Sequence, residues 1–251
     1  MDKKRIKAEL MIHDLKNPLA VIEAGLSSLI QRQEKYGPVS ENQLKVLKRT
    51  LRNTKIAKGL VNDILEVGRS TEGIYKNDRS LFNDFVKSPF VEVFDLTDNE
   101  TAEKIKECTD LPSLKEILTG KGILLKMDDE LWLQEVYFDQ SKLRQILRNL
   151  LSNALKYRKE IVEVEISRNK NALFLSVRDD GQGIKKIYHK KIFECYFQLD
   201  EERERCIRGH GLGLAGILIL VEDMGGEVNL DSDEGKGAKF SVRIPLHREG
   251  S

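Results

Sequence analysis

Two asparagines stand out on a helical pattern that is otherwise apolar on its inner face, over residues 141–157. Asn149 and Asn153 are four residues apart, so they share one face of the predicted helix, with Lys156 and Tyr157 just beyond them. An amide oxygen is a hard ligand that suits Mg²⁺, an ion that usually shares its coordination shell with substrate phosphates. A lysine can pair with a phosphate as a point charge. The pattern indicates a metal and phosphate site, although such asparagines in isolation are more often plain surface residues.

A carboxylate followed by glycines ends a later predicted strand, in the stretch Asp179-Asp180-Gly181-Gln182-Gly183-Ile184. A carboxylate there can accept a hydrogen bond from an exocyclic amine such as that of adenine. Glycines let the backbone turn tightly beneath a flat base. An ordinary turn is the competing interpretation.

Three alternate glycines, Gly209, Gly211 and Gly213, form the third signal, together with Leu212 and Leu214. Glycine amides can approach a ligand closely, and free N–H groups at the start of a helix favour negative charge. The stretch therefore indicates a loop that holds phosphate, and a plain turn is an alternative of about equal weight.

A histidine lies on the solvent side of the first predicted helix, which covers residues 1 to about 34. His13 and Asn17 are i,i+4 neighbours, Asp14 adjoins them, and Pro18 should bend the helix beside them. Most lone surface histidines do nothing, but one beside a proline kink is a candidate for chemistry.

A heptad seam positions this histidine. Apolar residues recur in alternating steps of four and three, with Ile12, Leu19 and Leu26 at a and Ala8, Leu15, Ile22 and Leu29 at d. After a Gly-Pro break, Ser40 and Gln43 resemble a capping box that starts a second helix. A two-helix hairpin alone buries too little of this seam, so we expect residues 1–70 to form a four-helix bundle as a homodimer.

A linker is predicted at residues 71–90, where Gly, Ser, Asn and Asp are frequent. Beyond it, the sequence predicts helices at 141–157 and 214–224 and strands at 91–96, 123–126, 131–138, 162–167, 173–177, 227–231 and 238–244. This order predicts an α+β domain over residues 91–248, an α/β sandwich with one mixed sheet covered on one face by helices.

Composition narrows the possible functions. The formal net charge is +1, which gives no electrostatic reason to expect nucleic acid or an anionic membrane as a partner. No apolar run approaches the roughly 20 residues that span a bilayer, so a membrane anchor or sensory part would lie outside this chain. The three cysteines lack a Cys-x-x-Cys pair and favour a reducing compartment, and we expect a cytoplasmic location.

Taken together, these signals resemble the conserved boxes of sensor histidine kinases. The stretch around His13 to Leu19 looks like the H box, which carries the phosphorylated histidine. The remaining boxes follow in order: an N box at 147–157, a G1 box at 179–183, an F box at 192–197, a G2 box at 209–214 and a glycine turn at 235–240. The match in order and spacing covers nearly the whole chain.

The resemblance implies a dimerisation and histidine-phosphotransfer hairpin followed by an ATP-binding domain of the Bergerat fold. It implies that His13 accepts the γ-phosphoryl group, that Asp14 orients the ring and takes its proton, and that Asn17 positions a water for dephosphorylating a response regulator. The regulator's receiver aspartate would be the next acceptor. In the ATP-binding domain it implies Mg²⁺ on Asn153, adenine on Asp179, and further nucleotide contacts from Asn149, Lys156, Tyr157, Gly181, Gly183, Ile184, Gly209, Gly211, Leu212, Gly213 and Leu214.

Two departures from the family pattern are present. Lys16-Asn17 stands where Arg-Thr is commoner, and His210 replaces a usual threonine. One alternative is a GHKL-type clamp ATPase, similar to gyrase, chaperone or mismatch-repair proteins, which would share the ATP boxes but lack the His-Asp-x-x-Asn-Pro hairpin. A degenerate kinase kept as a dimerising scaffold is disfavoured, because every expected ATP residue is present.

Overall fold

The computed structural model describes residues 3–70, 78–95, 97–194 and 213–246. It describes side chains from residue 15 onward, apart from those at 56, 60, 62–70, 78–80, 136 and 137. The chain divides into two compact units, Met1–Glu72 and Gly73–Ser251. Among the described residues, no helix combines the length and the apolar character that crossing a bilayer requires.

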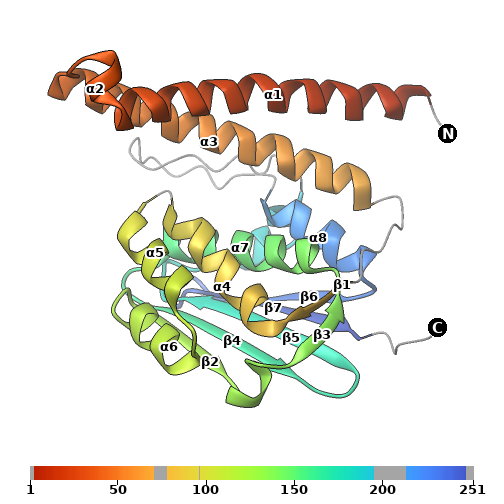
Figure 1. Ribbon diagram of the computed structural model, residues 1–251. Helices are drawn as coiled ribbons and strands as arrows, with labels where there is room; N and C mark the ends of the chain where they lie inside the picture. The colour runs from red at the N-terminus through yellow and green to blue at the C-terminus, as the bar shows by residue number, and fades with distance from the viewer. Residues whose placement is uncertain (1–2, 71–77, 96, 195–212, 247–251) are drawn as a thin grey trace. The chain divides into compact units, whose positions relative to one another are not determined.

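The first unit is a helical hairpin of α1 (Lys3–Gln31), the short α2 (Gln33–Tyr36) and α3 (Glu41–Ser70), with α1 packed against α3 (Figure 1). The predicted capping box is confirmed at the start of α3. The Ser40 backbone N–H donates to Gln43 Oε1 at 2.9 Å, and the Gln43 N–H donates to Ser40 Oγ at 3.3 Å. These reciprocal bonds satisfy amides that have no partner within the helix.

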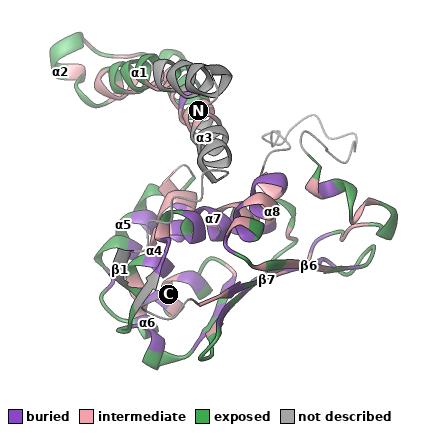
Figure 2. Ribbon diagram, turned by 90° about the vertical axis from the view of Figure 1, so that its right-hand side faces the viewer, coloured by how far each residue is buried: buried purple, intermediate pink, exposed green. Residues whose placement is uncertain are grey.

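In the single chain, the described a positions of the α1 heptad seam are partly buried, whereas the described d positions are exposed. Leu19 and Leu26 at the a positions are half-buried. Leu15, Ile22 and Leu29 at the d positions are 52%, 46% and 37% exposed. Figure 2 accordingly shows mainly exposed and intermediate residues on the described part of the hairpin.

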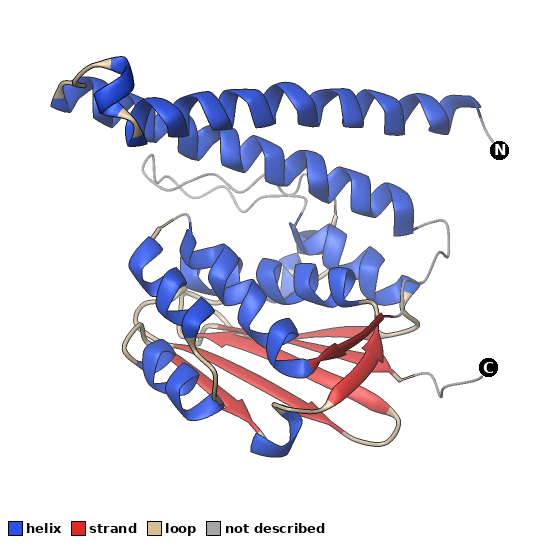
Figure 3. Cartoon of the chain, in the orientation of Figure 1, coloured by secondary structure: helices blue, strands red, loops and turns tan. Residues whose placement is uncertain are grey.

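The second unit is built on a five-stranded mixed sheet with the order β2-β4-β5-β7-β6 (Figure 3). Only β2 and β4 run parallel, whereas the other neighbours are antiparallel. Burial alternates along the strands, so one face carries the core and the other faces water. The strands are β2 (Ile123–Met127), β4 (Val162–Arg168), β5 (Ala172–Asp179), β6 (Glu227–Ser232) and β7 (Ala238–Pro245).

Helices cover one face of this sheet (Figure 1). The central helix α7 (Gln140–Tyr157) packs on β5 through its apolar stripe, and α8 (Gly213–Asp223) packs beside it. The stripe consists of leucines and an isoleucine that are at most 1% exposed, namely Leu143, Ile146, Leu147, Leu150 and Leu151. The predicted α/β sandwich is confirmed.

Three further helices and a small sheet complete the second unit. They are α4 (Phe82–Asp95), α5 (Asn99–Glu107), α6 (Leu111–Thr119) and the antiparallel pair β1 (Asp78–Leu81) and β3 (Glu135–Phe138). Single 3-10 turns cover Asp129–Leu131, Lys186–Tyr188 and Lys191–Phe193.

Residues 78–95 differ from the prediction. The strand predicted at 91–96 is wrong, because residues 91–95 belong to α4. Much of the predicted linker 71–90 is also structured, as β1 and the start of α4. The alternation of Val91 and Val93 suggested a strand, but the buried phenylalanines Phe82, Phe85, Phe90 and Phe94 recur at helical spacing and decide the element. The predicted domain boundaries remain a prediction.

Candidate nucleotide site

The two predicted asparagines, Asn149 and Asn153, lie in the C-terminal half of helix α7. Asn153 is half-buried, and its side chain makes no hydrogen bond to another described residue. In Asn149, both the oxygen and the nitrogen of the side-chain amide are hydrogen-bonded. The Asn149 Oδ1 accepts from Arg148 at 3.3 Å, and its Nδ2 donates to the Gly213 carbonyl at 3.5 Å. Asn149 therefore joins α7 to the first residue of α8.

Lys156 and Tyr157 lie at the exposed end of α7 and contact each other. The Lys156 ammonium donates to the Tyr157 hydroxyl at 2.8 Å and lies 4.6 Å from the centre of its ring. Tyr157 remains 58% exposed. The Tyr157 ring and the Lys156 ammonium are thus in contact at the exposed edge of the site.

Asp179 ends β5 as a buried carboxylate, with only 6% of its surface exposed. Its Oδ1 accepts a hydrogen bond from the Gly181 N–H at 2.9 Å. Burial raises the pKa of Asp179 above its ordinary value, and the backbone donors at Gly181 and Ala238 oppose this shift without cancelling it. A buried acceptor with a perturbed pKa at a strand end is typical of a binding site.

The glycines after Asp179 are required by close backbone contacts. A Cβ on Gly181 would lie 2.3 Å from the Tyr157 carbonyl oxygen, at the end of α7. Gly183 has a φ of 72°, and a Cβ there would lie 1.9 Å from the Asp233 carbonyl oxygen. No larger residue fits either position without movement of the backbone, so the turn is held against both α7 and the β6–β7 hairpin.

Two anchors of this turn were missed by sequence reasoning. The Asp180 carboxylate accepts hydrogen bonds from the N–H groups of residues 159–161 at 2.8–3.1 Å, just beyond α7. Ser232 is buried in β6, where its hydroxyl accepts from the Ile184 N–H at 2.8 Å and donates to the Gly237 carbonyl at 2.7 Å. Nothing in the sequence around Ser232 distinguishes it from an ordinary strand serine, whereas Asp180 lies inside a recognised motif.

The start of α8 closes the described part of the site. Gly213 and the half-buried Leu214 begin this helix, so the last two residues of the predicted glycine loop lie at a helix N-terminus. Gly209, Gly211 and Leu212, like His210, lie outside the described residues. The structure thus brings together the ends of α7 and β5, the turn at 181–184 and the first residues of α8.

The predicted phosphoacceptor belongs to the hairpin unit. His13 and Asp14 are part of α1, but their side chains lie outside the described part of the chain. Asn17 is exposed, and Pro18 lies within the helix.

The described residues contain no group of three or more His, Cys, Asp or Glu side chains that could hold a metal ion. A cation near α7 would therefore depend on amide oxygens such as that of Asn153, together with oxygens of a phosphate ligand. This ligand set fits Mg²⁺, which rarely binds in an all-protein cage.

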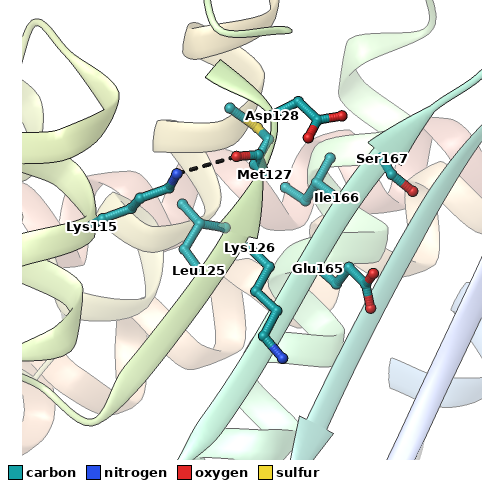
Figure 4. A pocket seen from close by; sticks show the side chains of 8 residues that line it. All are labelled: Lys115, Leu125, Lys126, Met127, Asp128, Glu165, Ile166 and Ser167. Atoms are coloured by element: carbon teal, nitrogen blue, oxygen red, sulfur yellow. Dashed lines mark hydrogen bonds between the residues drawn. The ribbon is translucent and has the colours of Figure 1, made fainter. Parts of the chain in front are cut away.

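A separate hollow lies at the β2 edge of the sheet. It has a volume of about 390 Å³ and is lined by side chains from α6, β2 and β4, with Lys115 donating to the Met127 carbonyl at 3.2 Å (Figure 4). None of its lining residues belongs to the site described above, so the hollow is not the nucleotide site.

The fold and the site define a class of protein. The mixed sheet, the amide-bearing helix and the glycine turn after Asp179 are those of an ATPase domain shared by several enzyme groups. Residues 138–248 match the family model described as histidine kinase-, DNA gyrase B- and HSP90-like ATPase. Residues 10–73 match a second model, the His Kinase A phospho-acceptor domain.

Relatives with both regions are sensor kinases. The chain is 28% identical to the sensor histidine kinase WalK of Bacillus subtilis over 94% of its own length and 36% of WalK's length. It is 29% identical to the sensor histidine kinase YkoH of the same organism over 99% of its own length and 49% of YkoH's length. The chain thus spans half or less of the length of these relatives.

Solved structures share the fold. Full-length ShkA, crystallised in complex with AMPPNP, aligns with 98% of this chain and 46% of its own, at a TM-score of 0.64 and 21% identity. The Acinetobacter baumannii histidine kinase AdeS aligns with 94% of this chain and 98% of its own, at a TM-score of 0.53 and 18% identity. The two family matches and the curated relatives assign the chain to the sensor histidine kinases of two-component systems, and the solved structures, at 21% and 18% identity, show that it shares their fold.

Proposed function

We propose that this chain is the core of a histidine protein kinase, which phosphorylates its own His13 from Mg·ATP and passes the phosphoryl group to a response regulator. The observation that carries the proposal is the buried carboxylate of Asp179, set above a glycine turn that has no room for side chains. A flat adenine can lie against such a turn while its exocyclic amine donates to the carboxylate.

The residues of α7 supply the other half of the nucleotide site. The Tyr157 ring would lie near the base, and the Lys156 ammonium would approach the phosphates as a point charge. Asn153 would hold Mg²⁺ through its amide oxygen, because its side chain is not already committed to another described residue. Bound Mg²⁺ would neutralise charge on the phosphates. Asn149 would hold the start of α8 close to them, through its contact with Gly213.

In the transfer step, a ring nitrogen of His13 attacks the γ-phosphorus of ATP. An N–P bond forms as the bond between the γ-phosphorus and the bridging oxygen breaks, and ADP leaves. Asp14 orients the imidazole and takes the ring proton. Phosphoryl transfer of this kind depends mainly on positioning and charge neutralisation, which the hairpin and the ATPase domain supply. The receiver aspartate of a response regulator then accepts the phosphoryl group, and Asn17 would position a water for the reverse, phosphatase reaction.

A homodimer is the assembly that best covers the hairpin. The d-position residues Leu15, Ile22 and Leu29 are exposed in the single chain and lie along one line of α1. A second hairpin would bury them in a four-helix bundle. The clamp-ATPase alternative is not favoured, because the phospho-acceptor family model matches residues 10–73.

The proposal is tested by incubating the protein with γ-labelled ATP and Mg²⁺ and measuring acid-labile label on the chain. We expect label on the wild type and none on His13→Ala. Equal labelling of the His13→Ala variant, or no labelling of the wild type, would refute the proposal. ATP hydrolysis without a phosphoprotein would indicate the clamp ATPase instead.

A further inference from the structure

Helices α7 and α8 are tied together at two points that lie far apart along both helices. At one point Asn149 donates to the Gly213 carbonyl at the start of α8. At the other, the Lys142 ammonium contacts the Asp223 carboxylate at the last residue of α8. The two contacts occur in opposite order along the two helices, so α7 and α8 run antiparallel.

The Lys142–Asp223 ion pair lies largely out of water. The two side chains are 11% and 17% exposed, and the Lys142 ammonium also lies 3.9 Å from the Asp139 carboxylate. Asp139 itself caps α7, where it accepts from the Lys142 backbone N–H at 3.2 Å. An ion pair removed from water contributes little net stability but favours one arrangement, because moving α8 would separate the Asp223 carboxylate from the Lys142 ammonium while both remain largely out of water.

The ion pair adds to the turn at residues 224–226, which joins the end of α8 to β6, because the apolar surface of α8 itself specifies its register poorly. Its sequence between Leu214 and Val221 is entirely apolar apart from Gly216. Ile217, Leu220 and Val221 are buried, but Leu218 and Ile219 on the other side of the helix are equally apolar. Hydrophobic contact has no direction, so rotating or sliding this helix would exchange one apolar contact for another. The polar ties at its two ends set its position.

We propose that Lys142 is a positioning residue for the nucleotide phosphates. By holding Asp223, it fixes the register of α8 and therefore places the backbone amides of Gly213 and Leu214 at the site. Amides at a helix N-terminus favour anions, so loss of the ion pair weakens binding of the phosphates and spares binding of the base. This inference rests on the proposed function, because it assumes that the site takes ATP.

Loss of the ion pair should leave binding of the adenine base unchanged for a structural reason. The turn after Asp179 is held by Asp180, through the amides of residues 159–161, and by Ser232 in β6. Neither anchor involves α8. Adenosine, which carries no phosphate, therefore reports on the turn and on the end of α7, whereas a triphosphate reports on α8 as well.

The test compares binding of Mg·AMPPNP and of adenosine to the full chain by calorimetry. Lys142→Met removes the ammonium and keeps much of the apolar stem, and Asp223→Asn removes the partner charge with little change in shape. If α8 then occupies its native register about a tenth of the time, AMPPNP affinity falls about tenfold. Adenosine affinity stays within about twofold of wild type by the same relation.

Two further variants serve as controls. Lys142→Arg keeps the charge and should restore most of the AMPPNP affinity. Lys104→Met removes a lysine from an exposed ion pair with Glu100 on α5 and should change neither affinity. Unchanged AMPPNP affinity in folded Lys142→Met and Asp223→Asn, or an equal loss for adenosine and AMPPNP, would overturn the inference. A wild type that binds neither ligand would instead overturn the proposed function.

Discussion

Replacing Ser232 with alanine tests whether the buried hydroxyl between β6 and the glycine turn holds the base site together. The hydroxyl accepts from the Ile184 N–H at 2.8 Å and donates to the Gly237 carbonyl at 2.7 Å, and Ser232 is only 6% exposed. Alanine leaves the half-buried Ile184 amide and the buried Gly237 carbonyl without this partner. Each such group costs roughly 1–3 kcal/mol, so we expect the free energy of unfolding to fall by about 3 kcal/mol.

Urea denaturation followed by tryptophan fluorescence measures this loss. Trp132 is the only tryptophan, and it is 4% exposed within the second unit, so its emission reports on the ATPase domain. With a denaturant slope of about 2 kcal/mol per M, a loss of about 3 kcal/mol moves the midpoint down by about 1.5 M while the slope stays unchanged. Adenosine affinity should fall as well, because the turn loses one of its two anchors.

Ser241→Ala is the matched control. Ser241 lies in β7, is half-buried, and its hydroxyl makes no hydrogen bond within the described part of the chain. Its removal should change the free energy of unfolding by no more than about 0.5 kcal/mol. If Ser232→Ala shifted the midpoint no more than Ser241→Ala does, the argument that the two hydrogen bonds of this hydroxyl stabilise the domain would be wrong.

Three further predictions concern the same site. Asn153→Asp should change the Mg²⁺ dependence of His13 labelling and strongly reduce it; unchanged labelling would contradict the metal role. Gly183→Ala should lose on the order of 3 kcal/mol, since its Cβ meets the Asp233 carbonyl, whereas Gly235→Ala, with a φ of 82° but open space, should lose about 1 kcal/mol in the same urea assay. Desolvation acts to raise the pKa of Asp180, but three backbone N–H donors outweigh it and lower this pKa. Its contribution to stability is therefore present above the unfolded pKa of about 3.9 and lost as pH falls through the folded pKa. In urea titrations at several pH values, the free energy of unfolding of Asp180→Asn should not show this decrease as the pH falls.

Local sequence patterns were sufficient for most of the fold. The heptad seam and the Ser40 capping box identified the hairpin, and the strand patterns at 162–167, 173–177, 227–231 and 238–244 identified β4, β5, β6 and β7. Patterns of this kind carry the information because hydrophobic period depends only on nearby residues. One exception was the strand predicted at 131–138, of which only Glu135–Phe138 forms β3. The other was α4, where Val91 and Val93 alternate like a strand. Its helix is decided by phenylalanines that pack into a core assembled from distant parts of the chain.

The candidate site divides in the same way. Asn149, Asn153, Asp179 and the glycines could be identified from the sequence because their residue types and spacing are unusual. Their mutual contacts could not, since the Gly181 contact with α7 and the Gly213 contact with Asn149 join segments at least 24 residues apart.

The sequence by itself supplied the candidate chemistry: a histidine near a proline within a helix, amides on another helix, and a carboxylate before glycines. Only the tertiary structure decided what holds these groups in place. Ser232 and the Lys142–Asp223 pair have ordinary residue types and no distinctive spacing. Their importance comes from burial, because a hydrogen bond or an ion pair away from water cannot be exchanged for a bond to solvent. Burial is a property of the packed chain, and no local pattern of residues specifies it.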